Sequence, residues 1–217
     1  MNSLNGRSRP FPPSSLPSYS CLQVSGLSFR YLQTDVFANL SFTISTGVTL
    51  VQGGDGRGKT TLLRLLAGEL KPQSGQILLR RLDLERPQVF WMDPRSIEHD
   101  QVKARDYLDD QAKHWPDFDH HGLAALIEGL SLAEFLDKPL YMLSTGSKRK
   151  VWLAAAFASN AAVALLDDPF AALDKPSIRF VTEVLQGIAL QSKRAVVMTG
   201  YDAPDNLPLA GLIDLGA

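Results

Sequence analysis

The chain contains one complete phosphate-loop motif, G-x-x-x-x-G-K-[ST], at residues 53–60, which read Gly-Gly-Asp-Gly-Arg-Gly-Lys-Thr. An apolar run precedes the motif at 48–51, and a helical pattern follows it at 61–66. Phosphate oxygens are bound by backbone N–H groups at close range, and glycines permit that approach because they carry no Cβ. The motif therefore predicts a strand, a loop that binds a nucleoside triphosphate, and a helix whose N-terminus faces the phosphates.

The side chains of the motif have separate predicted roles. Lys59 is expected to reach the β and γ phosphates, and Thr60 is expected to ligate Mg²⁺. The predicted nucleotide-binding residues of this segment are the whole loop and the residue after it: Gly53, Gly54, Asp55, Gly56, Arg57, Gly58, Lys59, Thr60 and Thr61.

Composition is typical of one globular domain, with 217 residues, 45% hydrophobic and 21% charged. A net charge of −1 provides no general attraction for nucleic acid, so no nucleic-acid partner is expected. Cys21 is the only cysteine, which excludes an internal disulfide and fits a reducing compartment. Residues 1–20 are rich in Ser and Pro and predict a disordered leader, followed by a single domain at 21–217.

Hydrophobic patterns predict an α/β fold. Strands are expected at 22–29, 40–44, 48–51, 77–79, 89–92, 163–166, 195–198 and 212–215, and helices at 61–70, 151–158 and 177–189. Helical periodicity with many charges from about 95 predicts a helical subdomain inserted at about 95–150. Strands that alternate with helices predict a mostly parallel sheet covered on both faces, here with an antiparallel β subdomain at the start.

A carboxylate pair follows the buried strand predicted at 163–166. Ligands of open parallel sheets collect at the carboxyl ends of the strands, so Asp167 is predicted to hold the Mg²⁺ shell. Asp168 is the candidate general base for a hydrolytic water. The alternative for this pair is the start of an ordinary loop.

Further segments resemble motifs of the ATP-binding cassette (ABC) ATPases. Residues 143–150 read LSTGSKRK and resemble the LSGGQ signature with its basic pair, and residues 171–174 read AALD and resemble the D-loop. Residues 71–75, KPQSG, resemble the segment after the phosphate-loop helix. The motifs occur in the family's order, and the resemblance extends over about 22–215, so the chain is identified as a P-loop NTPase of the ABC type.

The resemblance implies ATP and Mg²⁺ as cofactors and two cassettes as the working unit. In the family, the signature of one cassette contacts the γ-phosphate held by the loop of the other, which a helix N-terminus can do. The implied signature residues are Ser144, Thr145, Gly146 and Ser147. Tyr31, 28 positions before Lys59, matches the family's adenine-stacking aromatic residue, with Phe29 as the alternative.

Three predicted catalytic positions differ from the family's usual residues. Asp168 replaces a glutamate and is one methylene shorter, and Asp93 replaces a glutamine, so it can bind Mg²⁺ or its water but cannot donate as an amide does. Tyr201 replaces a histidine and carries no cation near neutral pH.

The resemblance implies the ATP-binding subunit of an ABC transporter, which hydrolyses Mg-ATP and drives a membrane permease in another chain from the cytoplasmic face. The short chain resembles single-cassette transporter ATPases such as those of haem export in cytochrome c maturation. The altered residues Asp168 and Tyr201 keep an alternative open: a degenerate cassette that hydrolyses little ATP itself and binds it as the structural or regulatory partner of a competent cassette. The second cassette can be an identical or a different chain.

Overall fold

The computed structural model describes residues 20–79, 89–191 and 193–216. The predicted leader at 1–20 lies outside the described residues, apart from Ser20 at the start of β1. The elements in chain order are β1 (Ser20–Tyr31), β2 (Thr34–Ser45), β3 (Gly47–Gln52), α1 (Lys59–Leu66), β4 (Ser74–Leu79), β5 (Val89–Trp91), α2 (Ala104–His114), α3 (His120–Gly129), α4 (Thr145–Ala158), β6 (Val163–Leu166), α5 (Lys175–Gln191), β7 (Ala195–Gly200) and β8 (Gly211–Asp214), with 3₁₀ turns at Ala133–Phe135 and Leu140–Met142.

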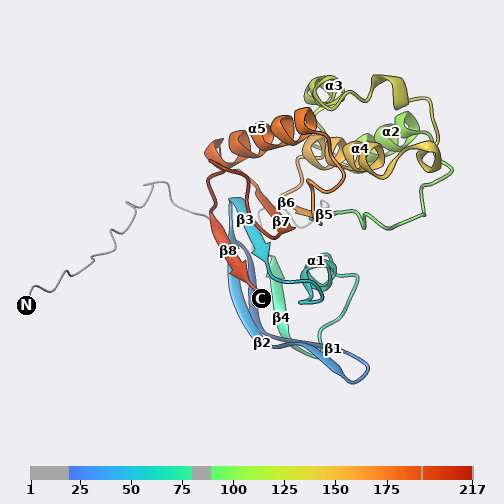
Figure 1. Ribbon diagram of the computed structural model, residues 1–217. Helices are drawn as coiled ribbons and strands as arrows, with labels where there is room; N and C mark the ends of the chain where they lie inside the picture. Colours follow the sequence, from blue (N-terminus) through green and yellow to red (C-terminus); the bar gives the residue numbers. More distant parts are fainter. Residues whose placement is uncertain (1–19, 80–88, 192, 217) are drawn as a thin grey trace, which may run out of the picture.

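The main sheet has five strands in the order β5-β6-β7-β3-β8, and every pairing among them is parallel. All four residues of β6 are buried because both faces of the sheet are covered. Val163 and Leu165 pack into the core around α1, whereas Ala164 and Leu166 pack into the core around α4 and α5 (Figure 1). The predicted α/β fold with a mostly parallel sheet is confirmed.

A second sheet, in the order β2-β1-β4, is antiparallel and closes the core on the α1 side (Figure 1). Strands β1 and β2 are longer than the predicted 22–29 and 40–44 because their pairing continues to the tight hairpin, where Tyr31 faces Thr34. The prediction for β2 also left out Phe37, which is buried in the core. The predicted antiparallel β subdomain is confirmed.

Helix α1 differs in extent from the predicted helix at 61–70. It begins at Lys59, inside the motif, and ends at Leu66. Gly68 then adopts a left-handed φ of 79°, and its N–H donates to the carbonyl of Leu65 at 3.1 Å. Glycine favours this reversal of the chain, so the prediction was wrong in extending the helix past the turn.

The chain between β5 and β6 is helical and builds onto the core around α4. Tyr107 and Leu108 of α2 and Leu126 of α3 are buried in the same cluster as most of α4. The boundaries of the inserted subdomain, about 95–150, stay a prediction. Within the described residues, no helix has the length and apolar character needed to cross a membrane.

Candidate functional site

The phosphate loop leads from the end of β3 to the first turn of α1. Gly58 caps the helix with a left-handed φ of 91°. A Cβ at this position would lie 2.6 Å from Val36 Cγ1 and 2.9 Å from Phe37 Cζ, closer than real Cβ atoms approach. Glycine is therefore required at 58 both by the backbone angle and by the β2 side chains against which the loop lies.

Lys59 is folded onto its own loop. Its Nζ donates to the carbonyl oxygens of Gly53 at 2.6 Å and Gly54 at 2.9 Å. The same ammonium lies 4.9 Å from the centroid of the Tyr201 ring. The cation is thus held within the loop, next to the N-terminus of α1, where an anion is favoured.

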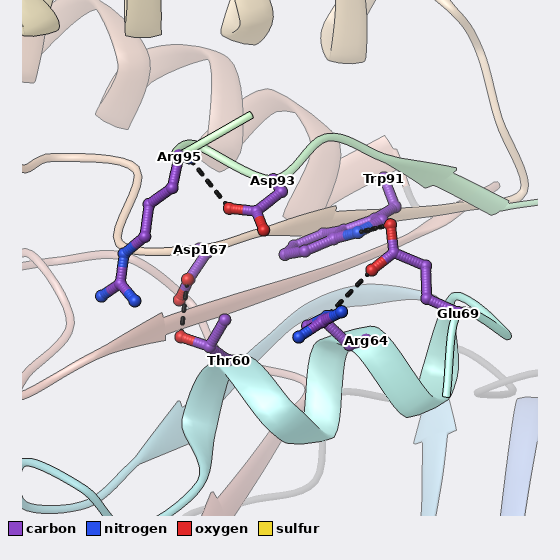
Figure 2. Close-up of polar contacts among 7 residues, drawn as sticks. All are labelled: Thr60, Arg64, Glu69, Trp91, Asp93, Arg95 and Asp167. Carbon is purple, nitrogen blue, oxygen red and sulfur yellow. Dashed lines mark hydrogen bonds and ion pairs between the residues drawn. The ribbon is translucent and has the colours of Figure 1, made fainter. Parts of the chain in front are cut away.

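Asp167 joins the phosphate loop to the neighbouring strands. Thr60 Oγ1 donates to Asp167 Oδ2 at 2.7 Å, a contact drawn in Figure 2, and Thr199 Oγ1 donates to Asp167 Oδ1 at 2.7 Å. Thr60 lies in the first turn of α1, Asp167 directly follows β6, and Thr199 is the penultimate residue of β7. The loop before α1 starts at β3, and β6, β7 and β3 are neighbours in the parallel sheet, so their carboxyl ends meet at one edge. The hydroxyl of Thr60 and the carboxylate of Asp167 provide the hard oxygen ligands that Mg²⁺ prefers.

Asp168 lies next to this junction in a left-handed conformation, with φ of 48°. Its backbone N–H donates to Thr199 Oγ1 at 2.8 Å, and its side chain is exposed. Aspartate visits this region more readily than longer side chains do. A single buried hydroxyl, that of Thr199, therefore positions both members of the carboxylate pair.

These groups surround a pocket of about 570 Å³. Its wall contains residues that the sequence predicted for the site and residues that it did not. The predicted residues there are Asp55, Gly56, Gly58, Lys59, Thr60, Thr61, Thr145, Asp167, Asp168 and Tyr201, and the others are Pro94, Arg95, Arg149, Thr199 and Gly200. Of the described residues predicted for the site, Tyr31, Gly53, Gly54, Arg57, Asp93, Ser144, Gly146 and Ser147 are not part of this wall.

Tyr201 connects β7 to the phosphate loop. Its hydroxyl donates to the Asp55 carboxylate, and this hydrogen bond is the main cause that raises the pKa of Tyr201. Tyr201 is 62% exposed, and the Lys59 ammonium lies over its ring. In this position Tyr201 contacts the phosphate loop directly.

Two arginines of the pocket were missed by the sequence reasoning. Arg149 donates from Nη1 to the carbonyl of Ala171, and burial lowers the pKa of Arg149 despite the opposing charges of Asp168 and Asp167. It follows Thr145 by four positions on α4, so a helical spacing places both on one face. That spacing was the available signal.

The other missed residue, Arg95, follows β5. Its backbone N–H donates to Asp93 Oδ1 at 2.8 Å (Figure 2), so the Asp93 carboxylate closes a local turn. Glu69 fixes the same strand to the end of α1, because it accepts from Trp91 Nε1 at 2.8 Å and from Arg64 Nε at 3.0 Å. These contacts place Arg95 beside the loop, while the catalytic and metal roles of Asp93 stay predictions.

The signature segment begins α4. Ser144 is the N-cap, and its Oγ accepts the N–H of Ser147 at 3.1 Å. A Cβ on Gly146 would lie 2.3 Å from the carbonyl oxygen of Ala172, so only glycine lets the helix approach the D-loop this closely. Ser144 is exposed and Gly146 is buried.

An ion pair fixes α4 to the same D-loop. Lys150 Nζ lies 2.6 Å from Asp174 Oδ2, and Asp174 Oδ1 accepts the N–H of Ser177 at 2.9 Å. The hydrogen bond from Lys150 is the largest of the causes that lower the pKa of Asp174 well below its usual value. Signature helix and D-loop therefore form one connected unit.

Tyr31 keeps the exposure that base stacking requires. It is 43% exposed and packs edge-on against Phe29, with ring centroids 4.9 Å apart. Its free face lies outside the wall of the phosphate pocket, and its role as the adenine platform stays a prediction.

Comparison with known proteins decides the family. The family model described as ABC transporter matches residues 37–171 of the chain. The chain belongs to the ABC transporter family. It is 34% identical to the cytochrome c biogenesis ATP-binding export protein CcmA of Pseudomonas syringae pv. syringae (strain B728a), over 92% of this chain and 96% of the relative. The protein of the same name from Legionella pneumophila (strain Lens) is 30% identical, over 85% of this chain and 95% of that protein.

Solved structures agree with this assignment. A putative ABC transporter ATP-binding protein from Pyrococcus furiosus is similar with a TM-score of 0.73 and 26% identity, covering 90% of this chain and 98% of the other. The chain is thus the ATP-binding, ATP-hydrolysing subunit of an ABC transporter, as the motifs predicted. The comparisons do not favour the alternative of a cassette that binds ATP with little hydrolysis.

Proposed function

We propose that the cassette binds ATP as its Mg²⁺ complex, with the metal held by Thr60 and Asp167. The observation that carries the proposal is the 2.7 Å hydrogen bond between Thr60 Oγ1 and Asp167 Oδ2, which brings two oxygen ligands together at the mouth of the phosphate loop. When bound, Mg²⁺ would neutralise charge on the β and γ phosphates. Lys59 and the N–H groups of the loop would bind the remaining phosphate oxygens.

Asp168 is the proposed general base of hydrolysis. Its exposed carboxylate lines the pocket that contains Lys59, so it can accept a proton from a water that attacks the γ-phosphate. Thr199 positions this residue through the hydrogen bond to its N–H and positions Asp167 through the bond to its carboxylate. Arg149 supplies a cation to the same pocket from the helical segment.

A second cassette is proposed to complete the site. Ser144 is exposed at the start of α4 and is absent from the described wall of its own chain's phosphate pocket, to which only Thr145 of the four signature residues contributes. The signature therefore presents Ser144 outward at the N-terminus of α4, where it could bind a γ-phosphate held by another chain. We extend the proposal to a dimer with ATP between the two cassettes.

The cassette is further proposed to drive a membrane permease in an export step of cytochrome c biogenesis, from the cytoplasmic face. Support comes from the relatives above, named cytochrome c biogenesis ATP-binding export protein, which the chain matches over nearly its whole length. A solved relative, described as an inward-facing conformation of a putative metal-chelate type ABC transporter, is 26% identical with a TM-score of 0.61, over 84% of this chain and 73% of that one.

Complementation tests the biological role. A strain that lacks the gene is expected to lose covalently attached haem in its c-type cytochromes, measured by haem-dependent peroxidase staining of denaturing gels. Wild-type protein should restore the stain, and Asp167→Asn should not. Unchanged staining in the deletion strain would contradict the proposed role of this chain in cytochrome c biogenesis.

Light scattering tests the dimer separately. Asp168→Asn, which retains the phosphate loop but slows hydrolysis, is expected to double its mass with Mg-ATP and to stay monomeric with ADP. The same measurement without Mg²⁺ should leave the protein monomeric. A monomer under all three conditions, with the permease absent or present, would contradict the proposed two-cassette site.

A further inference from the structure

A second pocket, of about 530 Å³, lies where α3 and the end of α4 face α5. Its wall comes from α3, the end of α4, α5 and the two residues that precede β7. Figure 1 shows α3 and α5 on the side of the main sheet that also carries α4. Since β7 runs from Ala195 to Gly200 and ends at the phosphate pocket, this second pocket lies at the opposite end of that strand.

Arg194 lines this pocket, and its guanidinium has no partner within the described residues. Its Nη1 is buried, and no hydrogen bond or ion pair of its side chain is found within the described residues. Burial alone lowers the pKa of Arg194 to about 10, which remains far above neutral pH, so the group stays charged. Buried charges are normally paired, because an unpaired one is costly. An unpaired guanidinium at a pocket therefore favours the binding of an anion there.

The rest of the wall is mostly apolar. Phe157 is buried, and Phe180, Val184 and Ile188 of α5 face the pocket half-buried. Phe180 closes against α3, where a Cβ on Gly129 would lie 2.2 Å from the ring. The volume and the mixture of apolar wall with few polar groups are those of small-molecule sites.

The charges of the wall select the kind of anion. Lys193 and Arg194 are opposed by Asp119, whose Oδ1 already accepts the N–H of Gly122 at 2.8 Å. One net positive charge remains, which suits a singly charged carboxylate better than a doubly charged phosphate. The planar guanidinium also matches a carboxylate with two parallel hydrogen bonds.

We propose that this pocket binds an organic carboxylate with a hydrocarbon body, its carboxylate on Arg194 and its chain against the α5 side chains. The ligand would contact α3 of the helical segment and α5 of the core at once, far from the phosphate loop. The site is independent of the proposed transport role.

Calorimetric titration of the full chain with octanoate tests the site, with octan-1-ol as the uncharged probe of equal chain length. We expect saturable octanoate binding to the wild type and binding weaker by about tenfold or more in Arg194→Gln, because a charged hydrogen-bonded pair is lost. Arg179→Gln is the matched control, since Arg179 is an exposed residue of α5 and lies outside the pocket wall. Its affinity should equal that of the wild type.

A second variant separates the pocket from the charge. Val184→Trp retains Arg194 but fills the apolar wall, and it should abolish octanoate binding while ATP binding at the other end of the sheet is retained. Thermal melting without ligand gives an independent readout: Arg194→Gln should melt no lower than the wild type, because it removes an unpaired buried charge. Equal octanoate affinity in the wild type and Arg194→Gln, or octan-1-ol binding as tight as octanoate binding, would overturn the proposal.

Discussion

Thr199→Val removes one hydroxyl while it conserves the shape of a side chain that is 2% exposed. The change eliminates the hydrogen bond to Asp167 Oδ1 at 2.7 Å and the one from the Asp168 N–H at 2.8 Å. A net contribution of about 1 kcal/mol for the neutral bond and about 1.5 kcal/mol for the bond to the half-buried carboxylate gives a loss of about 2–3 kcal/mol. For a chain of this length, the melting temperature should fall by about 4–12 °C.

Catalysis should suffer more than binding. Without Thr199, the N–H of Asp168 loses its partner and the left-handed turn is no longer fixed, so the carboxylate moves relative to the attacking water. Displacements of this kind cost about 10²-fold in rate, and we expect kcat for phosphate release to fall by about 10- to 100-fold. The dissociation constant of ATP should change little, because the contacts of Lys59 and the loop remain.

Thr199→Ser is the matched control, since it keeps the hydroxyl and loses only a methyl group. Steady-state phosphate release and calorimetric ATP binding should be measured for the wild type and both variants below their melting temperatures. Serine should stay near the wild-type rate, whereas valine should not. If the valine variant melts lower but turns over ATP as fast as the wild type, the hydroxyl supports the fold alone and its positioning role is refuted.

Three further changes test other parts of the site. Lys59→Ala should abolish tight Mg-ATP binding in calorimetry, because it removes the only cation bound to the loop carbonyls in the described structure; equal affinity would refute the phosphate-loop assignment. Gly146→Ala should destabilise the protein by about 1–3 kcal/mol in urea unfolding, because the new methyl group meets a D-loop carbonyl, whereas Gly187→Ala on α5 has open space and should not. Asp174→Asn should lower stability at pH 7. Since Lys150 lowers the pKa of Asp174 in the folded state, that carboxylate stabilises the fold above its unfolded pKa of about 3.9, and the difference between the two proteins should shrink as pH falls below about 4; a difference independent of pH would exclude the ion pair as its cause.

The centre of the site could be predicted from sequence because each part is specified by a short segment. A glycine-rich loop between an apolar run and a helix predicts where Lys59 and Thr60 lie, and a buried strand that ends in Asp167 predicts a carboxylate at the same edge of the sheet. The hydrogen bond between Thr60 and Asp167, 107 positions apart, follows from parallel strand order. Local patterns and the topology they imply therefore agree here.

The remaining features depend on packing that no local pattern specifies. The role of Thr199 requires β7 to lie beside β6 in one particular register, in which Leu166 pairs with Met198. The position of Arg149 requires α4 to approach the D-loop at a glycine. The end of α1 was also predicted too late in the chain, because the turn at Gly68 ends the helix although the following residues continue the helical pattern.

The departures from the family's usual residues have a structural explanation that their sequence positions alone did not reveal. Tyr201 bonds to Asp55, which occupies a position that the loop motif leaves unrestricted, so the tyrosine and the aspartate form a matched pair. Replacing Tyr201 alone with histidine would therefore leave Asp55 without the hydroxyl donor it now has. Asp168 likewise has a left-handed backbone, which tolerates aspartate better than a longer glutamate, so added reach at this position would be offset by backbone strain. Both residues thus fit their surroundings. This fit favours an ATPase site adapted to aspartate and tyrosine over a site that has lost function by losing a glutamate and a histidine.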